Sequence, residues 1–421
     1  MGDRRTLGVG LVGTGFIAGF HLTAFAGVRD ADVVAVYGPH LDKATALAER
    51  ARAEGLGGTR AYDDLRALVR DPAVEAVWVL APNYARLGVV ETIVDEVASG
   101  RATLRGIAIE KPLASTLDEA IRVRELVESV GLPHAYLENQ VYAPAITRTH
   151  SVIWQRGVPG SGSPYLARCA EEHSGPHSAW FWDGRKQGGG VLNDMMCHSV
   201  EAGRFLLTPP GVRPSDWLKP VSVQATIASL KWGRASYAAQ LSERFDGAVD
   251  YTRHPAEDYA RATYEFVNGD GEPCIVEATT SWSFVGAGMR LSWELLGPEY
   301  SLSADTLSTE GRVFLSRELS QAAGEEMLEK QQAEQGLLPV ISDESLTYGY
   351  TTENQVICRD FLAGRQPTES LREGVEVVEL LMAAYQAAET GRTLTWPLDL
   401  TGFTPAVARG EWNPRAEGGG R

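Results

Sequence analysis

The sequence lacks several features that mark specialised classes of protein. Its 421 residues include four cysteines and no CxxC pair, too few for a disulfide framework. No uninterrupted apolar run approaches the roughly 18 residues that a transmembrane helix needs. No signal-peptide pattern precedes the first strand-like segment. We therefore expect reduced thiols, a cytoplasmic location and no membrane partner.

Positive charge is also scarce. The chain has 39 lysines and arginines against 55 acidic residues, a net charge of 39 − 55 = −16. This balance argues against nucleic-acid binding, although a local basic pocket for an anionic substrate remains compatible with it. The length exceeds what one hydrophobic core usually supports, so we expect two globular domains, at residues 1–145 and 146–421.

What the sequence does contain begins with the segment LGVGLVGTGFIAGF, residues 7–20. An apolar run of strand length turns through two glycines and continues as a helix containing Ala18, which gives the GxGxxA pattern in a strand–turn–helix context. Such a turn lets a pyrophosphate approach the backbone at a helix N-terminus. The cofactor-binding residues that we assign to it are Gly13, Thr14, Gly15, Phe16 and Ile17.

The second strand-like run bears on the choice between NAD and NADP. It ends at Tyr37, Gly38, Pro39 and His40, without the acidic residue that usually binds the ribose hydroxyls of NAD. We expect NAD because no cationic residue occupies positions 38 and 39. NADP remains open because His40 and Lys43 would be able to meet a 2′-phosphate. Tyr37, Gly38 and His40 join the predicted cofactor site.

Further alternation of strands and helices predicts a parallel, doubly wound sheet. Two strand-like runs end in APN, residues 81–83, and EKP, residues 110–112. Ligands of such sheets bind at the carboxyl ends of the strands. The cofactor residues that we assign to these ends are Ala81, Pro82, Asn83, Glu110 and Lys111.

At this point the sequence resembles a known family. The GxGxxA turn, APN, EKP and the later GGGVLNDMMCHSVE, residues 188–201, occur in the order found in the Gfo/Idh/MocA oxidoreductases. Residues 353–397 are similar to the closing helix of that family, so the resemblance spans nearly the whole chain. It implies an N-terminal Rossmann domain, a C-terminal α/β domain with an open, mostly antiparallel sheet, and a last helix packing back toward the Rossmann domain. It also implies a homo-oligomer, dimer or tetramer.

The second half of the sequence agrees with such a sheet. Strand-like stretches divided by Gly, Pro and Asp turns cover residues 164–173, 221–230, 261–269, 274–283, 290–305 and 313–319. Residues 233–260 are polar and lack a clear pattern. We interpret them as an inserted loop that contributes to a lid or a subunit contact.

The resemblance implies an enzyme that transfers hydride between NAD(P) and a ring carbon, C3 in our prediction, of a sugar, cyclitol or glycoside. Lys111 would donate to the substrate hydroxyl, His198 would transfer its proton, and Asp194 would orient substrate or imidazole. The residues themselves support this chemistry, because oxidation of a carbinol needs a base and histidine suits that task near neutral pH. Asp194 and His198 lie four apart, on one face of a predicted amphipathic helix.

Several alternatives remain open for this pair. Asp194 would also suit a helix cap, and the two residues would also suit a surface contact. Together with His173 and His177 they would supply ligands for a divalent ion, and the protein would then be an isomerase or lyase. We predict no metal, because HSGPH is not a helical segment. A non-catalytic NAD(P) sensor would be expected to lack Lys111 or His198.

Two further segments predict the substrate. In AYLENQVYAPA, residues 135–145, Asn139 and Tyr142 match the family pattern, whereas Val141 replaces its usual basic residue. LEN at this place is also similar to the redox-neutral NAD-dependent glycosidases, sulfoquinovosidases among them, which oxidise C3 transiently and eliminate the aglycone. The segment EEHSGPHSAWFWDGRKQGGG mixes aromatic and polar residues as carbohydrate sites do, and an arginine would meet an anionic substituent. Asn139 completes the predicted cofactor site. The predicted substrate-binding residues are Lys111, Tyr142, Arg168, His173, His177, Trp182, Arg185, Asp194 and His198.

Overall fold

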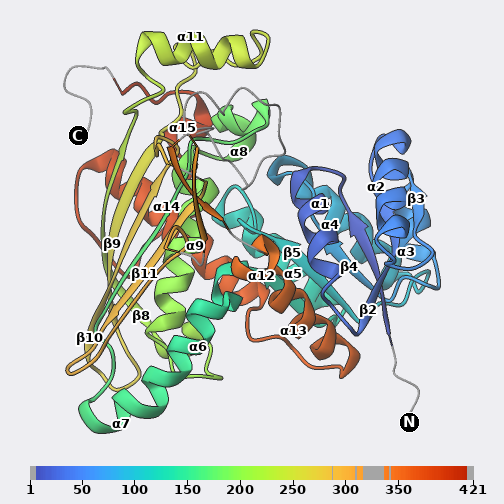
Figure 1. Ribbon diagram of the computed structural model, residues 1–421, viewed down its shortest axis with the longest axis horizontal. Coiled ribbons are helices and arrows are strands. Elements are labelled where there is room, and N and C mark those ends of the chain that lie inside the picture. Colours follow the sequence, from blue (N-terminus) through green and yellow to red (C-terminus); the bar gives the residue numbers. More distant parts are fainter. Residues whose placement is uncertain (1–5, 287, 309–310, 316–335, 341–342, 415–421) are drawn as a thin grey trace. The chain divides into compact units, whose positions relative to one another are not determined.

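The computed structural model describes residues 6–286, 288–308, 311–315, 336–340 and 343–414 (Figure 1). The chain divides into two compact units, residues 1–144 with 348–376, and residues 145–347 with 377–421. Residues 348–376, which the sequence led us to place in the C-terminal domain, therefore cluster with the first unit. In the described part of the chain, no helix combines the length and apolar character of a membrane span.

The first unit is built on a six-stranded parallel sheet with the strand order β3-β2-β1-β4-β5-β6. This order confirms the predicted doubly wound sheet. Strands β1, β4, β5 and β6 are buried along their whole length, as expected when helices cover both faces. The strands are β1 (Leu7–Val12), β2 (Ala31–Tyr37), β3 (Arg60–Tyr62), β4 (Ala76–Val79), β5 (Gly106–Glu110) and β6 (His134–Leu137).

A helix from far along the chain completes the core of this unit. Helix α13 packs beside α1, while α4 contacts α3 and α5. Trp78 of β4 lies edge-on between Phe25 of α1 and Phe361 of α13, with ring centroids 5.4 and 5.9 Å away. The helices are α1 (Phe16–Phe25), α2 (Leu41–Ala53), α3 (Leu65–Arg70), α4 (Asn83–Ala98), α5 (Leu117–Ser129), the 3-10 turn η1 (Asn139–Tyr142) and α13 (Tyr350–Leu362).

The second unit contains a seven-stranded sheet with the order β12-β11-β7-β10-β9-β8-β15. Only β7 and β10 pair in parallel among its described strands, so the predicted, mostly antiparallel sheet is confirmed. Strands β13 and β14 form a separate antiparallel pair, and residues 316–319 of the last expected strand lie outside the described residues. The strands are β7 (Leu166–Glu172), β8 (Lys219–Ala228), β9 (Tyr259–Val267), β10 (Pro273–Ser281), β11 (Arg290–Leu296), β12 (Ser301–Asp305), β13 (Gly311–Leu315), β14 (Gly336–Val340) and β15 (Leu394–Thr395).

Helix α9 (Val191–Leu206) lies against one face of this sheet (Figure 1), where it packs on β7 and β10. Fifteen of its sixteen residues are buried, so the predicted amphipathic helix is in fact enclosed on all sides. The other helical segments are α6 (Pro144–Val152), the π-helical turn η2 (Ile153–Gly157), α7 (Val158–Ser161), the 3-10 turn η3 (Ala179–Trp182), α8 (Gly184–Gln187), α10 (Pro214–Trp217), α11 (Ala235–Arg244), α12 (Glu344–Thr347), α14 (Leu371–Thr390) and α15 (Ala406–Arg409).

Residues 233–260 are not irregular throughout, as we expected of an inserted loop. Residues 235–244 form α11, which buries Ala238 and Leu241. The end of the segment is anchored as well, because the wholly buried Asp258 accepts hydrogen bonds from the backbone N–H groups of residues 230, 231 and 232 at 2.6, 2.9 and 2.7 Å. Helix α11 has a readable signal, since Ala238 and Leu241 lie three residues apart on its buried face.

Candidate active site

The glycine turn of the first unit has the shape that the predicted cofactor requires. Gly13 has a φ of +139°, and a Cβ there would lie 2.8 Å from the carbonyl oxygen of Leu80, so only glycine fits. Apart from its chain neighbours, no described atom lies within 4 Å of a Cβ placed on Gly15. Helix α1 begins directly after Gly15, which has no side chain to cap it. The turn therefore fits the pyrophosphate of a dinucleotide.

The register of the sheet brings the other predicted cofactor residues to the same edge. Val12 pairs with Tyr37 on one side and with Val79 on the other, and Ile109 pairs with Val79. Gly38 packs against the side chain of Thr14, since a Cβ there would lie 2.6 Å from its methyl carbon. The predicted residues that follow these strand ends are Gly13, Thr14, Gly15, Gly38, His40, Ala81, Pro82, Asn83 and Lys111, with Phe16 and Ile17 opening α1 and Asn139 following β6.

Buried carboxyl groups surround the end of β5, where Glu110 precedes Lys111. Burial alone would raise the pKa of Glu110, but the hydrogen bond with His21 and the charges of His21, Lys111 and Arg86 hold this pKa below its usual range. After β6, burial raises the pKa of Glu138 to about 8, although the charge of Lys111 lowers it. Sequence reasoning missed His21 and Glu138. For His21 a signal was available, because it lies three residues after Ala18 on the buried face of α1.

The η1 turn after β6 carries the two remaining predicted residues of this unit. The side-chain amide of Asn139 donates to the carbonyl oxygen of Tyr348 at 2.7 Å, so this asparagine ties the turn to the segment before α13. Burial, reinforced by surrounding acidic residues, raises the pKa of Tyr142 well above its usual value. Tyr142 is therefore a neutral hydrogen-bonding group at ordinary pH.

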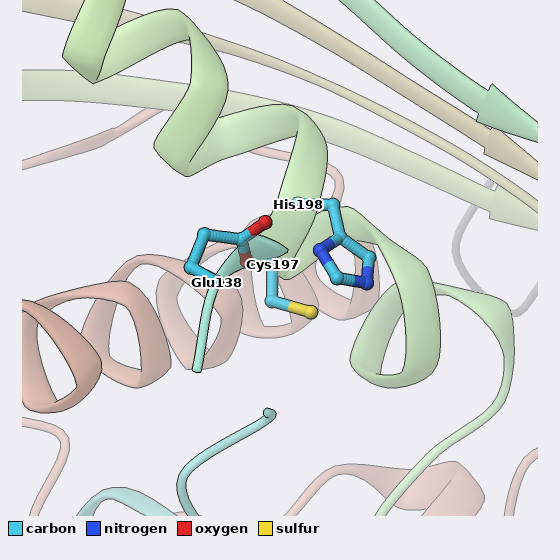
Figure 2. A group of neighbouring side chains, drawn as sticks. All are labelled: Glu138, Cys197 and His198. Atoms are coloured by element: carbon cyan, nitrogen blue, oxygen red, sulfur yellow. The ribbon is translucent and has the colours of Figure 1, made fainter. Parts of the chain in front are cut away.

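In the second unit, the predicted acid and base both project from buried positions of α9. Asp194 is 5% and His198 3% exposed, and Figure 2 shows His198 beside Cys197 on the helix. The indole N–H of Trp282 donates to Oδ2 of Asp194 at 3.2 Å. Nε2 of His198 lies 3.8 Å from Oε2 of Glu171, on β7. The interpretations as a surface contact or a helix cap are thus wrong, because the residues are buried and the N-cap is Gly190.

The triple-glycine turn leaves room for two side chains, Glu257 and Tyr385, to pack against the N-terminus of α9 and hold it in place. Oε1 of Glu257 accepts from the N–H groups of Gly190 at 2.8 Å and Leu192 at 3.1 Å. The hydroxyl of Tyr385 donates to the same oxygen at 2.5 Å and accepts from the N–H groups of Gly190 at 3.1 Å and Asn193 at 3.2 Å. A Cβ on Gly190 would lie 2.5 Å from the backbone oxygen of Glu257. Burial raises the pKa of Glu257 to about 7.

Two predicted histidines differ sharply in their surroundings. His173 is fully buried, and its Nδ1 accepts from the N–H of Gly175 at 2.9 Å. Its own backbone N–H donates to the carbonyl oxygen of Ser281, the residue before Trp282, so His173 lies near the partner of Asp194. His177 is exposed, with Nδ1 3.5 Å from a guanidinium nitrogen of Arg244.

Three other predicted substrate residues have structural surroundings. Trp182 is 1% exposed and packs on Trp232 and Trp282, with centroids 5.2 and 5.0 Å away. Arg185 is bound to Asp183 at 2.9 Å. Arg168 binds two carboxylates across the sheet, on the face opposite Glu171. Its partners are Glu277 at 2.8 Å and Glu294 at 3.4 Å.

Sequence reasoning did not find four residues that contact α9, namely Glu171, Glu257, Trp282 and Tyr385. Only Glu171 left a usable signal, because it occupies the buried side of the alternation along β7, where an acidic residue is unusual. The others reach α9 from 67 to 195 residues away, and nothing in their local sequence indicates the contact.

A cavity of about 710 Å³ lies away from all of these residues. Most of its lining precedes β4, β5 and β6, at the opposite edge of the first sheet from the glycine turn, and Phe361 and Gly364 at the end of α13 complete it. Its arginines are already paired, Arg105 with Glu75 and both Arg70 and Arg101 with the buried Glu96. We do not assign the active site to this cavity.

Comparison with known proteins identifies both halves of the chain. A family model described as an oxidoreductase family with an NAD-binding Rossmann fold matches residues 7–136, and a GFO/IDH/MocA C-terminal domain model matches residues 161–303. Among solved structures, GenD2 from gentamicin A biosynthesis in complex with NAD is similar with a TM-score of 0.73 and 26% identity, covering 94% of this chain and 97% of GenD2.

Curated relatives match over a shorter region. Levoglucosan dehydrogenase of Pseudarthrobacter phenanthrenivorans is 27% identical over 48% of this chain and 52% of its own length. D-glucoside 3-dehydrogenase of Escherichia coli is 26% identical over 56% of this chain and 65% of its own length. The chain thus aligns with about half to two thirds of each of these enzymes.

Proposed function

Because this chain belongs to the Gfo/Idh/MocA oxidoreductase family, we propose that it transfers hydride between NAD and a secondary alcohol of a sugar, glycoside or cyclitol. The observation that carries the proposal is the buried set on α9, where His198 lies beside a carboxylate and Asp194 is held by an indole N–H. Buried ionisable groups are costly to place in a fold and are concentrated at functional sites, which supports a catalytic role for this pair.

The first unit would hold the cofactor. The open turn at Gly15 and the N–H groups that begin α1 would bind its pyrophosphate, and the loops after β2 and β4 would border it. When bound, the nicotinamide accepts or donates the hydride. Gly38 and Pro39, which directly follow β2, carry no charge that would bind a 2′-phosphate, in keeping with NAD.

The second unit would supply the base. His198 would take the proton of the hydroxyl that is oxidised, and the carboxylate of Glu171 would stabilise the imidazolium that forms. Asp194, fixed by Trp282, would orient the substrate by accepting from a neighbouring hydroxyl. Lys111, at the end of β5, would donate to the reacting oxygen and stabilise the charge that develops on it.

For the substrate we propose a pyranose ring oxidised at C3, with Tyr142, His173 and His177 among the groups that contact it. The names of two relatives support this choice, since one is a D-glucoside 3-dehydrogenase and the other acts on levoglucosan, as its name states. We leave Arg168, Trp182 and Arg185 out of the site, because ion pairs or core packing account for them.

The test is to incubate the purified protein with NAD⁺ and a panel of pyranoses, glycosides and cyclitols while following NADH. We expect NADH to accumulate in step with an oxidised carbohydrate. His198→Ala should lower kcat by about 10²- to 10⁴-fold, the usual contribution of a general base. The matched control is His150→Ala, which removes another buried histidine, bonded to the carbonyl oxygen of Thr208.

Two results would contradict the proposal. Full turnover of His198→Ala would remove the assigned base. Release of an aglycone without net NADH would show the redox-neutral glycosidase reaction instead, in which hydride returns to the substrate.

A further inference from the structure

A chain of buried hydrogen bonds in the first unit leads to the residue before Lys111. The indole N–H of Trp78, on β4, donates to Oδ1 of Asn354 at 3.0 Å. The same Oδ1 lies 3.1 Å from Nδ1 of His21, on α1. Nε2 of His21 lies 3.2 Å from Oε2 of Glu110, at the end of β5. All four side chains come from the residues of this unit, and His21 and Asn354 are fully buried.

The series of hydrogen bonds determines which of its atoms carry protons. An indole nitrogen can only donate, so the atom of Asn354 that faces Trp78 must be its oxygen. Since that oxygen only accepts, Nδ1 of His21 must carry a proton. The other ring nitrogen faces a carboxylate, which also accepts when ionised. Hydrogen-bond chemistry therefore favours a doubly protonated His21 paired with an anionic Glu110.

The surrounding charges agree with this assignment. The charges of Lys111 and Arg86 also help to hold the pKa of Glu110 low. Glu353 of α13 differs, because burial and the charges of Glu110 and Glu138 raise its pKa well above the usual value. One carboxylate, Glu110, therefore interacts with two neutral carboxyls, Glu138 and Glu353. The titratable groups that interact with Glu110 are Lys111, His21 from α1, Arg86 from α4, Glu138 from the end of β6 and Glu353 from α13.

We propose that His21 is a positioning residue for Lys111. The His21 imidazolium offsets the charge of Glu110 and so leaves the Lys111 ammonium a strong hydrogen-bond donor. This rests on the role proposed for Lys111 above. Without the imidazolium, the unopposed Glu110 carboxylate would make the Lys111 ammonium hold its proton more tightly. The ammonium would then donate less strongly to a developing alkoxide.

The protonation of His21 is testable on the wild-type protein without substrate. Nitrogen-15 NMR of labelled histidine distinguishes an imidazolium from either neutral tautomer. The resonance of His21 among the eight histidines is identified by its loss in His21→Gln. We expect both ring nitrogens to carry a proton in the spectrum at neutral pH, as the hydrogen-bond geometry requires. A neutral ring under these conditions would overturn the proposal.

The effect on Lys111 appears in the pH profile of kcat/KM. The limb that reports Lys111 is the one lost in Lys111→Arg. In His21→Gln this limb should move to higher pH by about one unit or more. Asn354→Leu keeps the imidazole but removes its acceptor, so it should move the limb in the same direction. It also serves if His21→Gln fails to fold.

The control His150→Gln should leave the limb in place, because His150 belongs to the other unit. An unmoved limb in both His21→Gln and Asn354→Leu, or an equal shift in His150→Gln, would contradict the proposal. Failure of the proposed function has a separate signature, namely no NADH from the wild-type protein with any carbohydrate while the NMR result stands.

Discussion

The two glycine turns of this protein look alike in sequence and serve opposite purposes. Gly13 and Gly15 open helix α1 in the first unit, and Gly189 and Gly190 open α9 in the second. Described atoms leave the space at Gly15 open, whereas the space at Gly190 is filled by Glu257. A glycine-rich entry to a helix therefore does not by itself indicate an anion site.

The difference teaches where each helix can act. The N-terminus of α1 offers its N–H groups to a ligand, as the cofactor role requires. The N-terminus of α9 is already satisfied by the Glu257 carboxylate and the Tyr385 hydroxyl. Helix α9 must therefore contribute through its side, where Asp194 and His198 lie.

The largest effect is expected from filling the open helix end. Gly15→Asp places a carboxylate at the N-cap of α1 without a clash, because Gly15 has an extended backbone with φ −80°. The helix should tolerate or favour it, but NAD affinity should fall by about 100-fold or more through repulsion of the pyrophosphate. Calorimetric titration measures the affinity, and thermal melting shows that the fold is kept.

Gly15→Ser is the matched control, because it adds a neutral cap at the same place. Its NAD affinity should fall by less than about tenfold, roughly 1.4 kcal/mol. Equal losses in the two variants would show that space, and not charge, decides binding at this turn.

The next effect concerns the side of α9. Trp282→Phe keeps a ring in the core but removes the N–H that donates to Asp194. Because hydrogen bonds to carboxylates contribute about 1.5–3 kcal/mol, kcat should fall about 10- to 100-fold while NAD affinity is retained. Unchanged kcat with a lowered melting temperature would assign Trp282 to packing alone.

A smaller effect is expected from opening the filled helix end. Tyr385→Phe removes the acceptor of the Gly190 and Asn193 N–H groups and should lower the free energy of unfolding by about 1–3 kcal/mol. Chemical denaturation measures the change. NAD affinity serves as the control, because α1 keeps its own end; a loss of NAD affinity at constant stability would contradict the division of roles.

The pH dependence of stability sharpens the same contrast. Since burial raises the pKa of Glu257 from 4.5 to about 7, the folded protein binds this proton more tightly than the unfolded chain. The resulting stabilisation is fully present below pH 4.5 and is lost as the pH rises through about 7. Glu257→Gln cannot titrate, so wild type should lose stability relative to it across this window. A constant difference in melting temperature would contradict the assignment.

The smallest effect is expected from Arg168 on β7, which contacts neither the N-terminus of α1 nor that of α9. Arg168 is solvent-exposed and held by Glu277 and Glu294. Arg168→Gln should change stability by less than about 1 kcal/mol and leave KM unchanged. A raised KM for an anionic glycoside would return Arg168 to the substrate site.

Local patterns explain which parts of the structure the sequence predicts. The strand runs, the Gly13 turn and the loops after β4 and β5 follow from hydrophobic periodicity and glycine placement over a few residues. Asn354 contacts His21, which is 333 residues away in the sequence, and Trp282 contacts Asp194, which is 88 residues away. Such contacts arise only when the folded sheets bring distant elements together. Helix α11 is a different case, because Tyr237, Ala238 and Leu241 follow a helical spacing that was readable in the sequence.

The most direct test of the central claim follows the hydride itself. A pyranoside carrying deuterium at C3 is incubated with the protein and NAD⁺, and the nicotinamide is then analysed by mass spectrometry. We predict that deuterium moves to the nicotinamide in amounts that match the oxidised sugar, with a slowed rate relative to the unlabelled substrate. Unlabelled nicotinamide with every carbohydrate of the panel would contradict hydride transfer at C3, and unreduced NAD⁺ throughout would contradict the oxidoreductase assignment.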